Sequence, residues 1–282
     1  VQFTEVIPAA DADINDLFES YSEDSAIDFI YQILARRYPI GRRLVEEGRM
    51  GRIGDCVDFF LRDRSSPQAI IRQLTTIVHE CGHFADLEAG GFSESFYIIT
   101  DDVDFSCSGG DTTDRNGNTF ARSLINRDAY ALEACRGGDN CDFYRQVYLD
   151  GDPEDDNFEG GDQGFNSILE ETTQYINSLA VGYAFHELYN GSVSERDGIL
   201  TFLWYITRYL KMAREEYPSS YEYILNNPCW RELTLTLWGR AWLYLELTEG
   251  LGQLGINDIA IEARLTDELV AEIDLLRDQQ CR

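Results

Sequence analysis

Residues 66–91, which read SPQAIIRQLTTIVHECGHFADLEAGG, constrain this chain more than any other stretch. Ser66 can cap a helix, Pro67 suits the first helical position, and Gly90 and Gly91 are typical of a helix end. Between these signals, apolar residues recur at helical spacing and form one face: Ile70, Leu74, Ile77, Val78, Cys81 and Phe84. The sequence therefore predicts a long helix with a buried side.

Two of the three histidines of the chain, His79 and His83, lie four residues apart in this helix, and Glu80 follows the first. Residues at this spacing share a helix face with Cβ atoms about 6 Å apart. Both imidazoles can then reach one ion at the zinc–nitrogen distance of about 2.0–2.1 Å. Glu80 is about 100° further round the helix, so it can accept a proton from metal-bound water without binding the metal. A chance occurrence is the weaker interpretation, because the motif lies in the helical context that it requires.

A catalytic zinc site needs a third protein ligand beside two histidines and a water. A metzincin would have a glycine and a histidine three and six residues after His83, where this sequence has Asp86 and Ala89. His186, the third histidine, is the less favoured candidate for this ligand. It lies 16 residues, or about 24 Å of helix, beyond Glu170, a candidate on the same predicted helix, so we expect His186 to be a half-buried polar residue near the helix end. Asp86 shares the face of the two histidines and is expected either to orient one of them or to be solvated.

The segment ILEETTQYINSLA, residues 168–180, together with the His-Glu-x-x-His motif, resembles the gluzincins, the thermolysin-like and aminopeptidase-like zinc peptidases. In these enzymes a second helix supplies a glutamate from an Asn-Glu-Gly-x-x-Asp or Glu-Gly-x-x-Glu-Tyr type of segment. The resemblance implies Glu170 as third ligand, with Glu171 as the alternative, and it places Tyr175 at the tyrosine. Gln174, one turn from Glu170, is expected to hydrogen-bond a zinc-bound imidazole.

This resemblance covers about 35 residues, 75–86 and 166–188, and it has three departures. Glu171 stands at the usual glycine and Gln174 at the usual acid. The interval from His83 to Glu170 is longer than in many members of the superfamily.

The resemblance implies an exported zinc metallopeptidase that acts on a peptide or protein substrate, with Glu80 as general base. Tyr175, Tyr183 and His186 are the candidate hydrogen-bond donors to the oxyanion. Two alternatives stay open: a catalytically inactive, metal-stabilised or protein-binding domain on the same scaffold, and a zinc hydrolase of non-peptide amides. Substrate, site of cleavage and oligomeric state do not follow from the sequence.

The remaining pattern predicts an α+β chain, and the resemblance implies a zincin-like fold that forms a single catalytic unit over residues 1–282. A mixed subdomain, 1–165, would hold a small sheet and the histidine helix, and a helical subdomain, 166–282, would carry the third ligand. Strands are expected at 55–63 and 94–100, either of which could supply a substrate-binding edge. Residues 101–165 are expected to be irregular. Helices are expected at 13–37, 166–189, 196–217, 231–250 and 267–280.

Charge and hydropathy exclude some classes of partner. The net charge of −28, from 51 acidic and 23 basic residues, repels phosphate backbones and favours basic or uncharged peptides over nucleic acid. No run of about 18 apolar residues is present, so no membrane span is expected. The chain begins at Val1, which is consistent with a removed leader or a trimmed sequence.

The seven cysteines fit no zinc pattern of the Cys-x-x-Cys kind. With Cys81 set aside as a buried residue facing away from the metal, six remain, and Cys135 and Cys141 flank RGGDN as a short disulfide loop would. Up to three disulfides, and hence export, are expected, with reduced cysteines in a cytosolic chain as the alternative. Residues 111–120 and 149–164 resemble calcium loops in composition only, so Ca²⁺ is a weakly supported second ion.

Overall fold

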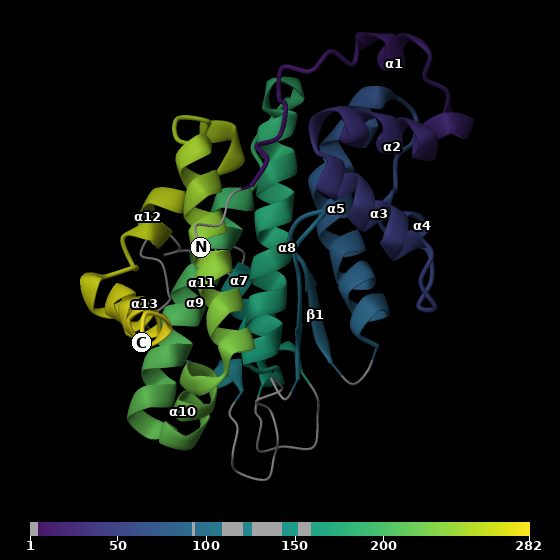
Figure 1. Ribbon diagram of the computed structural model, residues 1–282. Coiled ribbons are helices and arrows are strands. Elements are labelled where there is room, and N and C mark those ends of the chain that lie inside the picture. The colour runs from purple at the N-terminus through teal and green to yellow at the C-terminus, as the bar shows by residue number, and fades with distance from the viewer. Residues whose placement is uncertain (1–4, 92–93, 109–120, 126–142, 152–158) are drawn as a thin grey trace. The chain divides into compact units, whose positions relative to one another are not determined.

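The computed structural model describes residues 5–91, 94–108, 121–125, 143–151 and 159–282 (Figure 1). These residues are mostly helical, with one two-stranded sheet, so the coarse expectation of an α+β chain is confirmed. The chain divides into two compact units, each assembled from three stretches. The first unit contains Val1–Ser106, Thr173–Arg196 and Arg240–Ile256, and the second contains Cys107–Thr172, Asp197–Gly239 and Asn257–Arg282. The units therefore interleave along the sequence and do not follow a single cut at residue 165.

The first unit is built around the long helix α5, which contacts α2, α3, α4 and β1. Its buried face carries Ile70, Leu74, Ile77 and Val78, all without exposed surface. This face is the one that the apolar spacing predicts. The elements that begin in this unit are α1 (Asn15–Glu19), η1 (Glu23–Ser25), α2 (Ala26–Arg37), α3 (Pro39–Arg49), α4 (Cys56–Phe60), α5 (Pro67–Gly90), β1 (Ser95–Ile98), β2 (Asp104–Cys107), η5 (His186–Leu188), α9 (Glu195–Glu216) and η6 (Gly252–Leu254).

The second unit is helical and has an aromatic core. The ring of Phe165 stacks on Tyr209 at 5.5 Å and meets the edge of Trp230 at 6.4 Å. All three side chains are fully buried. The elements that begin here are η2 (Arg122–Leu124), α7 (Phe143–Tyr148), η4 (Gly160–Asp162), α8 (Phe165–Ala184), α10 (Pro218–Asn226), α11 (Pro228–Leu247), α12 (Asp258–Glu262) and α13 (Asp267–Gln280).

Local signals predicted several elements correctly. Ser66 accepts a hydrogen bond from the backbone N–H of Ala69, Pro67 begins α5, and Gly91 ends it at a φ of 63°. Helices α8, α9, α11 and α13 and strand β1 lie within a few residues of their expected positions. Segment 13–37 is two helices, α1 and α2, with a turn and a short 3-10 helix between them. Helices α3, α7, α10 and α12 and strand β2 were not expected. Of these, β2 and α7 lie within residues 101–165, which were expected to be irregular.

The strand expected at residues 55–63 is wrong, because residues 56–60 form helix α4. Asp55 caps this helix by accepting hydrogen bonds from the backbone N–H groups of Val57, at 2.9 Å, and Asp58, at 3.4 Å. This capping stabilises a helical turn over an apolar run that is too short to show its period. Of the two expected substrate edges, only the one at β1 is a strand.

Two disulfides are present among the described residues, Cys56–Cys81 in the first unit and Cys107–Cys229 in the second. Setting Cys81 aside from disulfide formation was therefore wrong, although it is fully buried as expected. Cys281 is free and exposed. Cys135 and Cys141 lie outside the described residues, and so do residues 111–120 and 152–158 of the calcium-like segments. The pair of disulfides is compatible with an extracytoplasmic protein.

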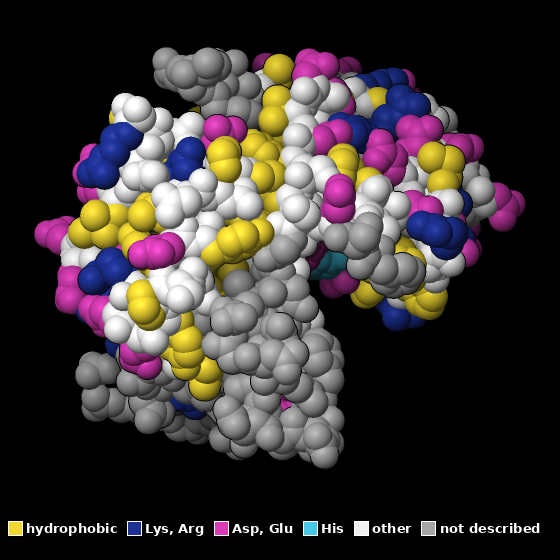
Figure 2. Space-filling view, turned by 60° about the horizontal axis from the view of Figure 1, so that its bottom comes forward, with side chains coloured by type: hydrophobic (Ala, Val, Ile, Leu, Met, Phe, Trp, Pro, Cys, Tyr) yellow, Lys and Arg dark blue, Asp and Glu magenta, His cyan; other side chains and the backbone are white. Residues whose placement is uncertain are grey.

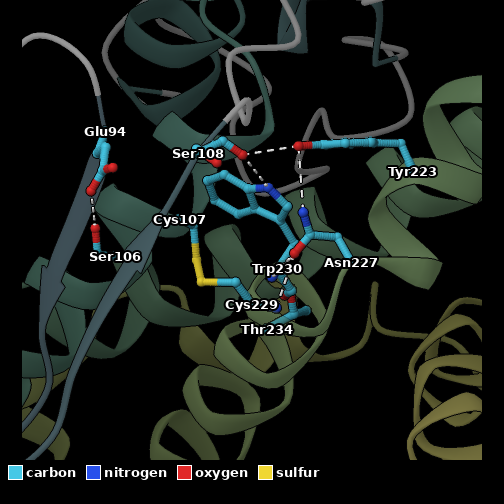
Figure 3. Close-up of a disulfide and its surroundings, with 9 residues drawn as sticks. All are labelled: Glu94, Ser106, Cys107, Ser108, Tyr223, Asn227, Cys229, Trp230 and Thr234. Carbon is cyan, nitrogen blue, oxygen red and sulfur yellow. Dashed lines mark hydrogen bonds between the residues drawn. A yellow bond between two sulfur atoms is a disulfide. The ribbon is translucent and has the colours of Figure 1, made fainter.

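Figure 3 shows how the second disulfide fixes the chain where the second unit begins. The backbone carbonyl of Ser108 accepts hydrogen bonds from Trp230 Nε1, at 3.2 Å, and from the hydroxyl of Tyr223, at 2.9 Å. The side chain of Asn227 caps α11 by accepting from the backbone N–H of Cys229 at 3.0 Å. Cys107 and Ser108 are thus bound to the first turn of α11 covalently and by hydrogen bonds.

Candidate metal centre

Helix α5 brings the two motif histidines together. The Nε2 atoms of His79 and His83 lie 3.0 Å apart, and the ring planes meet at 77°. His79 is 8% exposed and His83 is half-buried, so the pair reaches the surface on one side. Two nitrogens on one tetrahedral zinc lie about 3.3 Å apart when each bond is about 2.0–2.1 Å. The histidines are therefore close to the spacing that one ion requires.

A carboxylate of α8 completes the group. Ligand atoms of His79, His83 and Glu171 all lie within 4.8 Å of one another. Two imidazoles and one carboxylate form a donor set that suits Zn²⁺ and leaves a fourth position for water. Other first-row divalent ions accept the same donors, so the group could hold a metal ion but does not identify the metal.

The carboxylate that joins the histidines is Glu171, the residue expected as the alternative, and Glu170 is not part of the group. Neighbouring residues point about 100° apart around a helix, so only one of the two can face a given partner. Glu171 Oε2 also accepts a hydrogen bond from the hydroxyl of Tyr148 at 3.4 Å. One carboxylate oxygen of Glu171 therefore has a protein donor.

Arg122 is a charged neighbour of Glu171 that no sequence pattern indicates. Its side chain is 2% exposed, and Nε donates to the backbone carbonyl of Tyr148 at 2.7 Å. Burial lowers the pKa of Arg122, and the charge of Glu171 is the largest influence in the opposite direction. A buried guanidinium thus balances part of the negative charge of the Glu171 carboxylate.

Tyr175 is the one expected oxyanion donor whose contact with a motif histidine is observed. Its ring lies 4.6 Å from that of His79, centroid to centroid, in an edge-to-face arrangement. Tyr175 follows Glu171 by one helical turn, so both lie on the same side of α8. Tyr183 and His186 stack on each other near the end of the helix, and His186 Nδ1 contacts the backbone carbonyl of Tyr183 at 2.8 Å. His186 is not in the metal group.

Glu80 is half-buried on α5, directly after His79, and is not one of the grouped ligands. This position is the one expected for a residue that acts beside a metal without binding it.

Asp86, three residues after His83 on α5, forms a buried pair with Gln174 of α8. Gln174 Nε2 donates to Asp86 Oδ2 at 2.8 Å, and the other carboxylate oxygen accepts from the backbone N–H of Ile98 at 2.9 Å. Asp86 is 3% exposed, so the expectation that it is solvated is wrong. The hydrogen bond from Gln174 to an imidazole stays a prediction.

Acidic side chains are spread over the described part of the molecular face in Figure 2, with Lys and Arg between them. They do not gather into one patch there, which agrees with a generally acidic surface. Among the described helices, none combines the length and apolar character needed to cross a bilayer.

No family model, curated protein or solved structure matches this chain.

Proposed function

We propose that this protein is a zinc-dependent peptidase of zincin-like fold, in which His79, His83 and Glu171 hold the ion. The observation that carries the proposal is the convergence of two imidazoles from α5 and one carboxylate from α8 on a common point. The resemblance to gluzincins rests on the same two helices. Export of the protein is part of the proposal and is supported by its two disulfides.

When bound, zinc supplies the Lewis acidity that activates a water and polarises the scissile carbonyl. Glu80, adjacent to His79, accepts the proton of the attacking water and passes it to the leaving amine. Tyr175, packed against His79, donates a hydrogen bond to the oxyanion. By analogy with zincins, the substrate lies extended along the β1–β2 sheet.

Partial exposure of the site favours catalysis over a purely structural metal. His83 and Glu171 are both half-buried, so a substrate can approach them from solvent. Closed structural zinc sites have four protein ligands, whereas the group has three among the residues that the structure describes. A structural zinc site also has no need of a general base such as Glu80 beside His79.

The test is a comparison of the zinc-loaded parent with Glu80→Gln on a diverse peptide library. The variant is expected to keep about one zinc per chain and to lose hydrolysis by about 10²–10⁴-fold, the usual contribution of a general base. Glu88→Gln is the matched control, since Glu88 lies two turns further along α5 and pairs with Arg52 at the surface. It should cleave like the parent.

Each other outcome rejects a stated part of the proposal. Zinc binding without cleavage of any peptide by the parent would reject the peptidase and leave a metal-stabilised binding domain. Cleavage of small non-peptide amides alone would indicate the other alternative. Full activity of Glu80→Gln would remove Glu80 from the reaction.

A further inference from the structure

Helices α5 and α8 make an unusually close contact between the two motif histidines. A Cβ atom added to Gly82 would lie 1.8 Å from Gln174 Oε1 and 2.5 Å from its Cδ atom. Any side chain at position 82 would therefore displace the amide of Gln174. The absence of a side chain at Gly82 is what lets the amide lie against α5.

The amide of Gln174 is not free to move aside, because both of its ends are hydrogen-bonded. Its Nε2 donates to Asp86 Oδ2, and its Oε1 accepts from Asn177 Nδ2 at 3.1 Å. Asp86 is in turn held by the backbone N–H of Ile98 in β1. Gln174 and Asn177 have no exposed surface. Breaking such buried bonds leaves polar groups without water to replace their partners.

These contacts lie one helical turn from the proposed ligands on both helices. Asp86 follows His83 by three residues on α5, and Gln174 follows Glu171 by three residues on α8. Residues at this spacing share a helix face. The spacing of the two helices at the contact therefore constrains the distance from the two histidines to Glu171.

We propose that Gly82, Asp86 and Gln174 act as a positioning clamp that sets the distance from the two histidines to Glu171. The inference rests on the metal site of the proposed function, but not on its reaction. Zinc–ligand distances vary by only about 0.2 Å between sites, so a shift of α8 away from α5 would lower the affinity of the site for zinc. Groups that hydrogen-bond a metal ligand contribute about 10–100-fold to metal affinity, and we expect a clamp that positions the ligands through the helices to contribute a similar factor.

Two substitutions each break the hydrogen bond between Asp86 and Gln174, and together they restore it with the donor and the acceptor exchanged. Asp86→Asn places an amide donor against the donor of Gln174, and Gln174→Glu places a carboxylate against Asp86. In the double variant the introduced amide donates to the introduced carboxylate. The amide oxygen still accepts from Ile98, and the carboxylate still accepts from Asn177. The pair keeps one negative charge, which moves from α5 to α8.

The measurement is zinc affinity, determined on the full chain by competition with a chromogenic chelator well below the melting temperature of each apo variant. Each single substitution should weaken zinc binding by about 10–100-fold, and the double variant should return to within about threefold of the parent. Gly82→Ala should weaken binding by a similar factor. Gly239→Ala is the matched glycine control and should bind zinc normally, because the added Cβ in α11 would meet no atom within 4 Å apart from its chain neighbours and the nearby backbone of its own helix.

The visible spectrum of the Co²⁺-loaded proteins is the second readout, because it reports ligand geometry rather than stability. The single variants should change the intensity of the Co²⁺ bands, and the double variant should restore it. If Gly82→Ala does not fold, Asp86→Asn, Gln174→Glu and their double variant still test the clamp.

Zinc affinity equal to the parent in both single variants, or no recovery in the double variant, would overturn the clamp and leave the proposed function intact. A parent that binds no zinc would overturn the clamp and the metal site together. A parent that binds zinc but cleaves nothing would reject the peptidase while the affinity pattern still supported the clamp.

Discussion

Cys81 is bonded to Cys56, so the helix that carries His79 and His83 is tied to α4 at a point between its two histidines. Both sulfur atoms belong to fully buried residues. A Cβ added to Gly48 of α3 would lie 2.4 Å from the carbonyl oxygen of Cys81, so α3 packs directly on the same point. The middle of α5 is therefore held by a covalent bond and by close packing.

Removing this disulfide should destabilise the protein without touching a metal ligand. The double variant Cys56→Ala, Cys81→Ala should lose about 3 kcal/mol of unfolding free energy, because the bond closes a loop with a sequence separation of 25. Urea unfolding monitored by circular dichroism measures the change. Cys281→Ser, at the free exposed cysteine, is the control and should leave the midpoint unchanged. Equal stability of the double variant and the parent would contradict this role.

Glu171 and Glu170 can be distinguished by zinc binding alone. Glu171→Gln should weaken zinc affinity by roughly a hundredfold or more, since four ligands together supply about 10–16 kcal/mol in structural sites. Glu170→Gln should change it little, because Glu170 lies outside the ligand group. The opposite ranking would show that the register inferred from the gluzincin resemblance is correct and that the observed grouping is not the metal site.

The buried ion pair of Glu5 and Arg240 anchors the N-terminal segment. Both side chains are almost fully buried, Arg240 at 0% and Glu5 at 2%, and the hydroxyl of Tyr244 also donates to Glu5 at 2.7 Å. Glu5→Gln should lower the unfolding free energy by about 3–5 kcal/mol, because it leaves a buried guanidinium uncompensated.

Replacing both members of this pair separates charge from packing. Glu5→Leu combined with Arg240→Met should be closer in stability to the parent than Glu5→Gln, since apolar pairs of similar volume often replace buried ion pairs without loss. Thermal and urea unfolding give the comparison. A loss below about 1 kcal/mol for Glu5→Gln would contradict the anchoring role.

Asp55 should make stability depend on acid pH. Burial alone would raise the pKa of Asp55, but the hydrogen bond and charge of Arg49, with the backbone N–H groups of Asp58 and Val57, lower it below the ordinary value. A lowered folded-state pKa contributes stability above the unfolded pKa of about 3.9, and this stability is lost as the pH falls below that value.

The Asp55→Asn variant isolates this charge, because asparagine is an equally good helix cap. At pH 7 it should be less stable than the parent by up to about 1 kcal/mol, the range for partly exposed ion pairs. Near pH 2–3 the difference should shrink. A difference that stays constant between pH 7 and pH 2 would mean that the carboxylate charge contributes nothing.

Substrate charge provides a further test. The net charge of −28 should favour peptides that are basic or uncharged, with the preference for basic ones weakening as salt rises from about 0.05 to 0.5 M. Cleavage rates across the peptide library at several salt concentrations measure this. A preference for acidic peptides would contradict it.

Sequence signals predicted the elements whose boundaries are set by neighbouring residues. Helix α5 carries its own cap, its own first-turn proline and its own terminal glycine. Pro39 likewise begins α3, directly after α2, but no helix was expected there. Helix α4 has only five residues, and its cap at Asp55 was the one local sign of it.

Properties that depend on distant residues could not be predicted in this way. The choice between Glu170 and Glu171 is set by the rotation of α8 about its axis, and tertiary packing determines that rotation. The partner of Gln174 is Asp86, 88 residues away. Cys81 looked like an ordinary buried residue because nothing near it in the sequence identifies Cys56 as its partner.

The Cys107–Cys229 disulfide also affects how backbone cleavage of this protein would be detected. It joins two residues with a sequence separation of 122. A peptide bond hydrolysed anywhere between them yields two polypeptides that remain one molecule, heavier than the parent only by a water. Under non-reducing electrophoresis such a nicked chain would run as a single species, and its fragments would separate only after a thiol was added. For a protein proposed to cut peptide bonds, self-cleavage in this region must therefore be examined under reducing conditions.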